Sequence, residues 1–144
     1  MSSTNALPKT LERLEEDNET AMMIQKRVGR HNIVLDARSV GNDLLVVIYG
    51  GDEHHIGAVA VAYPTMSHYK AKGTVSLNSL TLPGHSDYVV ANSAAEKTCR
   101  ALRITTVVTV GIHMENASKE EIEGAVEAAD LMVDEMIAHH KKPL

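Results

Sequence analysis

The chain has 144 residues, of which 44% are hydrophobic, and it carries a formal net charge of −5. This length is typical of one domain. Because the chain has no Phe and no Trp, its core must be aliphatic. Its Lys and Arg residues are scattered, which argues against nucleic acid as the main partner. The sequence contains no run of about 18 apolar residues, so we expect no membrane-spanning helix. The first residues lack a secretory pattern, so we expect a cytoplasmic protein.

Residues 1–18 are predicted to form an N-terminal extension of the main domain. Proline is favoured in the first turn of a helix, so Pro8 predicts a short helix over 8–18. Three leucines repeat there at helical spacing, namely Leu7, Leu11 and Leu14. We interpret this helix as a cover for an edge of the domain, and a partner-binding arm is the alternative. The remainder, 19–144, is predicted to be a single α+β domain.

Five strands are predicted in the first half of that domain. Period-two alternation and glycine-containing turns mark them, and their connections are short, which favours antiparallel pairing. The predicted strands cover residues 20–28, 33–37, 44–49, 56–63 and 74–82.

The apolar period then changes to that of a helix over 86–102, where Ser86 and Asp87 are predicted to cap the helix with their side chains. A β-branched strand is predicted over 104–110. The residues 118–121 match a capping box and open a C-terminal helix. Together these elements predict an α+β fold, with a mostly antiparallel sheet of about six strands and two main helices packed on one face.

Glycine and histidine occur together at the ends of three predicted strands, in the segments 50–57, 83–87 and 111–116. Loop ends on a rigid sheet are common places for functional sites, so we expect these three loops to meet. We interpret His55, His85 and His113 as the main binding residues. Second-rank members of the same site are Glu53, Glu115 and Asn116.

Imidazole and carboxylate groups suit a divalent metal or a proton-transfer site. The tentative metal ligands are His55, His113, Glu53 and Glu115. The alternative is that the histidines only cap strand ends. His31 and His68 are expected on the surface. The helix starts at Ser86 and Ser118 suit a phosphate, although both serines are also explained as simple caps.

Several short motifs resemble the LpdD-like family over about residues 20–138. They are the segment 55–62, then Gly84-His85, the segment 107–116, and the acidic start of the last helix at 120–122. These family members are small accessory subunits of gallate-type decarboxylases and are described as chaperones for prenylated flavin. The chain departs from the pattern at His54, where proline is usual, and at Glu115, where aspartate is common.

The resemblance implies a proteasome-assembly-chaperone-like fold, a homodimer, and a UbiD-type decarboxylase as partner. It implies binding of prenylated FMN, or FMN, with an additional divalent metal left open. The small residues 57–62 would then accept the flat rings, and a histidine-bearing glycine loop would take the phosphate. The predicted cofactor-binding residues are His55, Gly57, Ala58, Gly84, His85, His113 and Asn116.

No complete catalytic motif is present, so we expect an accessory protein rather than a stand-alone enzyme, with a role in cofactor oxidation left open. A protein-interaction module without a small ligand is the alternative from another class. A metal-dependent hydrolase or lyase is a third, and it rests only on the histidine and glutamate residues.

Overall fold

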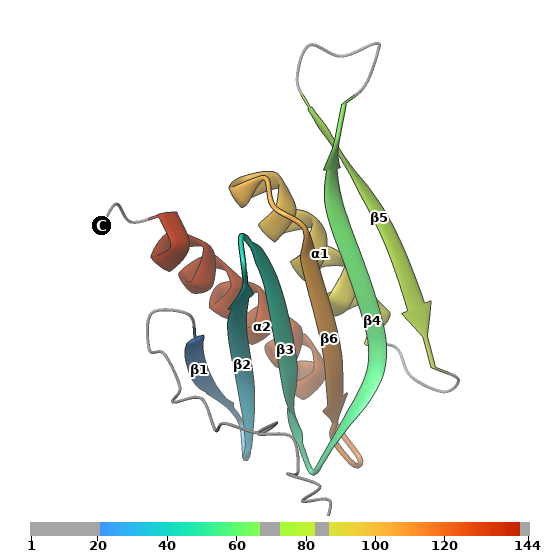
Figure 1. Ribbon diagram of the computed structural model, residues 1–144. Coiled ribbons are helices and arrows are strands. Elements are labelled where there is room, and N and C mark those ends of the chain that lie inside the picture. The colour runs from blue at the N-terminus through green and yellow to red at the C-terminus, as the bar shows by residue number, and fades with distance from the viewer. Residues whose placement is uncertain (1–20, 67–72, 83–86, 142–144) are drawn as a thin grey trace, which may run out of the picture.

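The computed structural model describes residues 21–66, 73–82 and 87–141 (Figure 1). Six strands form one sheet in the order β1-β2-β3-β6-β4-β5. Within this part of the chain, no helix combines the length and the hydropathy needed to cross a bilayer. The elements are β1 Ala21–Val28, β2 His31–Val40, β3 Asp43–Gly51, β4 Glu53–Thr65, β5 Thr74–Thr81, α1 Tyr88–Leu102, β6 Thr106–His113 and α2 Lys119–Lys141.

Four of the five strand pairs among the described residues are antiparallel, in agreement with the predicted mostly antiparallel sheet, but the sheet is mixed because one central pair is parallel. Strand β6 lies between β3 and β4, and it pairs with β3 in parallel from Leu44 opposite Thr106 to Gly51 opposite His113. The consecutive strands β3 and β4 run in opposite directions, so a strand that lies between them must be parallel to one and antiparallel to the other. The predicted helix over 8–18 lies outside the described residues.

Both helices pack on the same face of the sheet, with α1 over β4 and β5 and α2 over β1 and β2 (Figure 1). Strand residues alternate, and every second side chain enters the core between sheet and helices. On β4 these inward residues are Ala58, Ala60 and Ala62, all almost fully buried. Their small side chains let α1 approach the sheet closely.

The opposite face of the sheet, here called the open face, is covered by no described helix. Its side chains come from the outward positions of four central strands and are mostly apolar and half-buried. They are Val34, Leu45, Val47, Tyr49, Val59, Val61 and Val107. An apolar face of this kind usually marks a protein interface.

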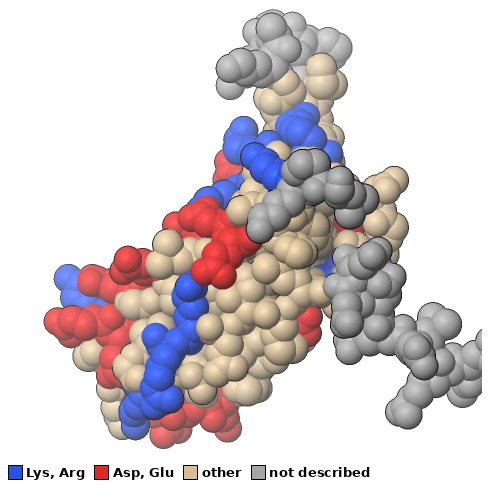
Figure 2. All heavy atoms as spheres, turned by 90° about the vertical axis from the view of Figure 1, so that its left-hand side faces the viewer, with Lys and Arg blue, Asp and Glu red and all other residues tan. Residues whose placement is uncertain are grey.

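Charged side chains of both signs gather on part of the side formed by β1 and α2, beside a broad area of uncharged residues (Figure 2). Lys and Arg side chains lie there beside Asp and Glu side chains, and Lys26 of β1 bonds to Glu135 of α2 at 2.8 Å. Exposed pairs of this type add little stability. The charges distinguish this side from the open face.

Candidate functional site

A bulge in β4 sets the position of His55. The pairing of β4 with β6 shifts register between His54 and Ala58, and residues 55–57 stand there opposite Gly111. A Cβ at Gly111 would overlap the carbonyl oxygen of His55, so only glycine permits this close approach. Bulges often re-aim a side chain next to a functional site. The polar residues predicted as a loop therefore begin a strand, and the bulge lies inside it.

The side chain of His55 faces Asp87, the residue that precedes α1. Its Nε2 lies 3.4 Å from Asp87 Oδ2, and its Nδ1 lies 3.4 Å from the carbonyl oxygen of Glu53. The rings of His55 and His113 meet edge to face with centroids 6.1 Å apart. The structure therefore brings two of the three predicted histidines together.

Asp87 has a role that the sequence did not indicate. It was predicted to cap α1, but its side chain makes no cap hydrogen bond. Instead its Oδ1 accepts a hydrogen bond of 3.2 Å from the backbone N–H of Ile112 in β6. The carboxylate is only 10% exposed, and its second oxygen faces His55. Asp87 thus ties the start of α1 to β6 and to the bulge of β4.

A pocket of about 380 Å³, here called the histidine pocket, lies beside this cluster. Its size lies within the usual range for small-molecule sites. It opens between the start of α1, the end of β6 and the start of α2. Asp87 and His113 supply its polar side chains, and its apolar lining includes Val90, Ile112, Met114, Ile122 and Val126.

The segment that follows β6 is held by the turn between β3 and β4. Asp52 Oδ2 accepts a hydrogen bond of 2.7 Å from the N–H of Glu115, and Asp52 donates its own N–H to the carbonyl of His113 at 2.7 Å. The hydrogen bond from Glu115 is the main cause that lowers the pKa of Asp52. Gly51 has φ +84°, and a Cβ there would overlap the carbonyl of His113. Arg30 adds a hydrogen bond to the carbonyl of Glu115.

The start of α2 confirms the predicted capping box. Ser118 Oγ accepts from the N–H of Glu121 at 3.1 Å, and Glu121 Oε1 accepts from the N–H of Ser118 at 3.3 Å. The expectation that His31 lies on the surface is wrong, because it is 5% exposed. Its ring lies between Asp52 at 3.7 Å and Glu121 at 3.9 Å. No local pattern in the sequence signals that burial.

The other predicted site residues fall in different environments. Glu53, Glu115 and Asn116 are exposed, and Asn116 adopts φ +52° in the turn before α2. Gly57 and Ala58 are buried, and Ala58 belongs to the hydrophobic core. Gly84 and His85 lie outside the described residues.

The described residues do not assemble the tentative metal ligands into a metal centre. Over 21–66, 73–82 and 87–141, no three His, Cys, Asp or Glu side chains are grouped so that they could hold a metal ion. Of the four predicted ligands, only His55 and His113 are neighbours through their rings. The arrangement suits hydrogen bonding to a polar ligand, since imidazole can donate or accept.

A family model described as the prenylated flavin chaperone LpdD-like domain matches residues 27–141. The chain belongs to this family. It is also 29% identical to Protein LpdD of Lactiplantibacillus plantarum over 99 residues, which cover 69% of this chain and 70% of the relative. The resemblance noted in the sequence motifs is thereby confirmed.

A solved structure supports the fold. A chain from the crystal structure of a chaperone complex for yeast 20S proteasome assembly superposes with a TM-score of 0.51 and 11% sequence identity. The match covers 83% of this chain and 98% of the other. At that identity the likeness concerns the arrangement of sheet and helices alone.

Proposed function

We propose that this prenylated-flavin chaperone family member binds prenylated FMN and assists its delivery to, or maturation in, a UbiD-type decarboxylase. One observation carries the proposal: His55, Asp87 and His113 converge from three different elements beside a largely apolar pocket of about 380 Å³. A flavin needs this combination, since its rings are flat and apolar while its phosphate and carbonyl groups are polar.

The polar groups of the flavin would lie at the histidine pocket. His113 offers an imidazole there. The start of α2 is a poorer anion site, because its capping box engages the N–H groups of Ser118 and Glu121 and its first turn carries Glu120 and Glu121. Asp87 opposes direct contact with a phosphate, but its charge is engaged by the N–H of Ile112 and by His55. The phosphate is therefore expected nearer to His113 than to Asp87.

The rim of the pocket suits a carrier that must release its ligand. Val89 and Ile122 line it and are each 52% exposed, so the apolar wall is open to solvent. A stand-alone enzyme generally encloses its reacting groups more fully. We infer an accessory protein that presents the cofactor to a client.

A protein-interaction module remains the second candidate, and the open face favours it. That face is apolar, lacks a described helix cover, and belongs to a fold shared with a proteasome assembly chaperone. The open face is also explained by the pairing of two copies of this chain, which is compatible with flavin binding. We propose such a homodimer, because pairing two open faces buries both.

Titration of the purified chain with prenylated FMN and with FMN, followed by absorbance, tests the proposal. We expect saturable binding of prenylated FMN, and transfer of that flavin when an apo decarboxylase of the UbiD type is added. Folded protein that binds neither flavin, with and without divalent metal, would contradict it. Recovery of a proteasome-like partner without flavin from the native host would instead favour the interaction module.

A further inference from the structure

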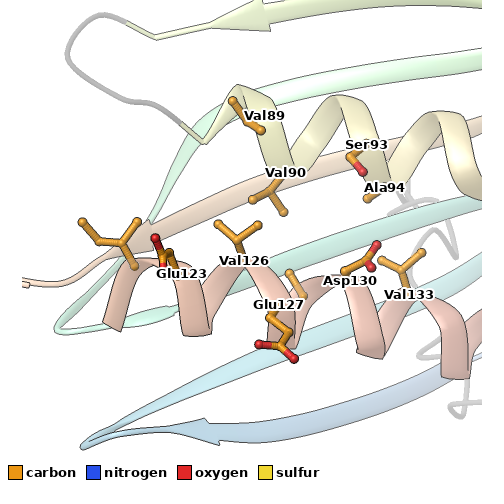
Figure 3. Close-up of a pocket in the computed structure, with 11 residues that line it drawn as sticks. Val89, Val90, Ser93, Ala94, Glu123, Val126, Glu127, Asp130 and Val133 are labelled. Carbon is orange, nitrogen blue, oxygen red and sulfur yellow. The ribbon is translucent and has the colours of Figure 1, made fainter. Parts of the chain in front are cut away.

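The two helices leave an apolar groove of about 450 Å³ between them, here called the interhelical groove (Figure 3). In Figure 3 the side chains of Val90 on α1 and Val126 on α2 point toward one another across it. Ala94, Ala129 and Val133 also line the groove and are almost fully buried. The groove is thus aliphatic, and no aromatic ring fills it.

The interhelical groove and the histidine pocket are adjacent and share part of their walls. Val89, Val90, Ile122 and Val126 line both. Along α2 the lining runs from Ile122 to Val133, which corresponds to about 16 Å at 1.5 Å per residue. That length leaves room for the hydrocarbon end of a flavin whose polar end lies beside His113.

Charge sets the direction in which a flavin would lie. Glu123, Glu127 and Asp130 border the interhelical groove, and Glu127 points away from α1 in Figure 3. Asp130 is paired with Lys97 at 2.8 Å, and Glu123 lies 3.8 Å from Lys119. Three acidic side chains thus stand against two lysines, which leaves the border acidic on balance. An anionic phosphate is therefore disfavoured there, and the hydrocarbon end of the ligand is favoured.

We propose that the interhelical groove receives the isoprenoid-derived part of the flavin and thereby selects prenylated FMN over FMN. This inference rests on the proposed function. The added hydrocarbon has no hydrogen-bonding needs, and an aliphatic groove offers it burial without cost to polar groups. Each buried methylene strengthens binding by about fourfold, so even partial burial gives selectivity of about tenfold or more.

The substitution Val126→Gln tests the groove, because it replaces an apolar wall that is 43% exposed with a polar helix former. Leu131→Gln is the matched control: Leu131 is also on α2, is 48% exposed and lies outside the groove. Val126→Leu retains an apolar wall. Each variant is titrated with prenylated FMN and with FMN after circular dichroism has verified its fold.

Because Val126 lines the histidine pocket as well as the groove, we expect Val126→Gln to weaken both flavins, but prenylated FMN about tenfold more than FMN. Leu131→Gln should bind both flavins as the parent protein does, and Val126→Leu should retain the preference for prenylated FMN. Equal affinity of the parent protein for both flavins, or equal weakening of both by Val126→Gln, would overturn the groove assignment while leaving flavin binding intact. A parent protein that binds neither flavin would overturn the proposed function, and this inference with it.

Discussion

Gly111→Ala is the substitution that most directly perturbs the bulge carrying His55. The added Cβ would come closer than 3.0 Å to the backbone carbonyl of His55, a separation that real Cβ atoms essentially never show. Because the obstacle is backbone in the middle of the sheet, no side-chain rotation can relieve it. Strand β4 must shift away from β6, and the imidazole of His55 moves with it.

The cost follows from the crowding of a packed interior. Overpacking typically costs 1–3 kcal/mol, and a rigid backbone neighbour places this case near the upper value, about 3 kcal/mol. With a urea dependence of about 2 kcal/mol per molar, the unfolding midpoint would fall by about 1.5 M. Flavin affinity would fall as well, since His55 would no longer face Asp87 at 3.4 Å.

Urea denaturation followed by far-UV circular dichroism measures this loss, with Gly124→Ala as the control. Gly124 is in the interior of α2, and a Cβ there would meet only the Val28 side chain at 2.9 Å. Alanine is also the better helix former by about 0.5–1 kcal/mol, so the control should remain within about 1 kcal/mol of the parent protein. Equal stability and flavin affinity of Gly111→Ala and the parent protein would refute the bulge as described.

Three further predictions concern single contacts and the assembly. Asp87→Ala should lower stability by about 1–3 kcal/mol and weaken flavin binding, because the N–H of Ile112 loses its acceptor and His55 its neighbour; unchanged urea midpoint and affinity would contradict this. The lowered pKa of Asp52 stabilises the fold at pH values above 3.8, the ordinary pKa of this carboxyl, and this contribution is lost as the pH falls through the folded-state pKa. The stability difference between the parent protein and Asp52→Asn should therefore shrink from pH 7 toward pH 3. A stability difference that is independent of pH would argue against this role of Asp52. Light scattering should give twice 15.6 kDa at micromolar concentration, whereas Val47→Glu on the open face should give a monomer; a monomeric parent protein would contradict the dimer.

Periodicity located the strands and helices well, because each element must bury one face. It could not reveal that β6 enters between β3 and β4. The short connection at Gly51 and Asp52 normally joins paired strands, and nothing local indicates that a later strand will separate them. The parallel pair is therefore a property of the whole chain rather than of any segment.

In the candidate site, too, local sequence patterns predicted some features, and others depend on tertiary packing. Glycine next to histidine at strand ends correctly suggested that His55 and His113 would meet. The side chain of Asp87 was assigned to a helix cap because capping is a local pattern, whereas its contacts with Ile112 and His55 depend on tertiary packing. The burial of His31 between two carboxylates is likewise a tertiary outcome.

The most direct test of the central claim is a titration of the parent protein, His55→Ala and His113→Ala with prenylated FMN at pH 7.5. Each histidine lies near the end of its strand and outside the hydrophobic core, so both variants should fold. We expect the parent protein to saturate with the flavin and each variant to bind about tenfold more weakly, a loss of about 1.4 kcal/mol. Identical affinities for all three proteins would contradict a flavin site built on these histidines.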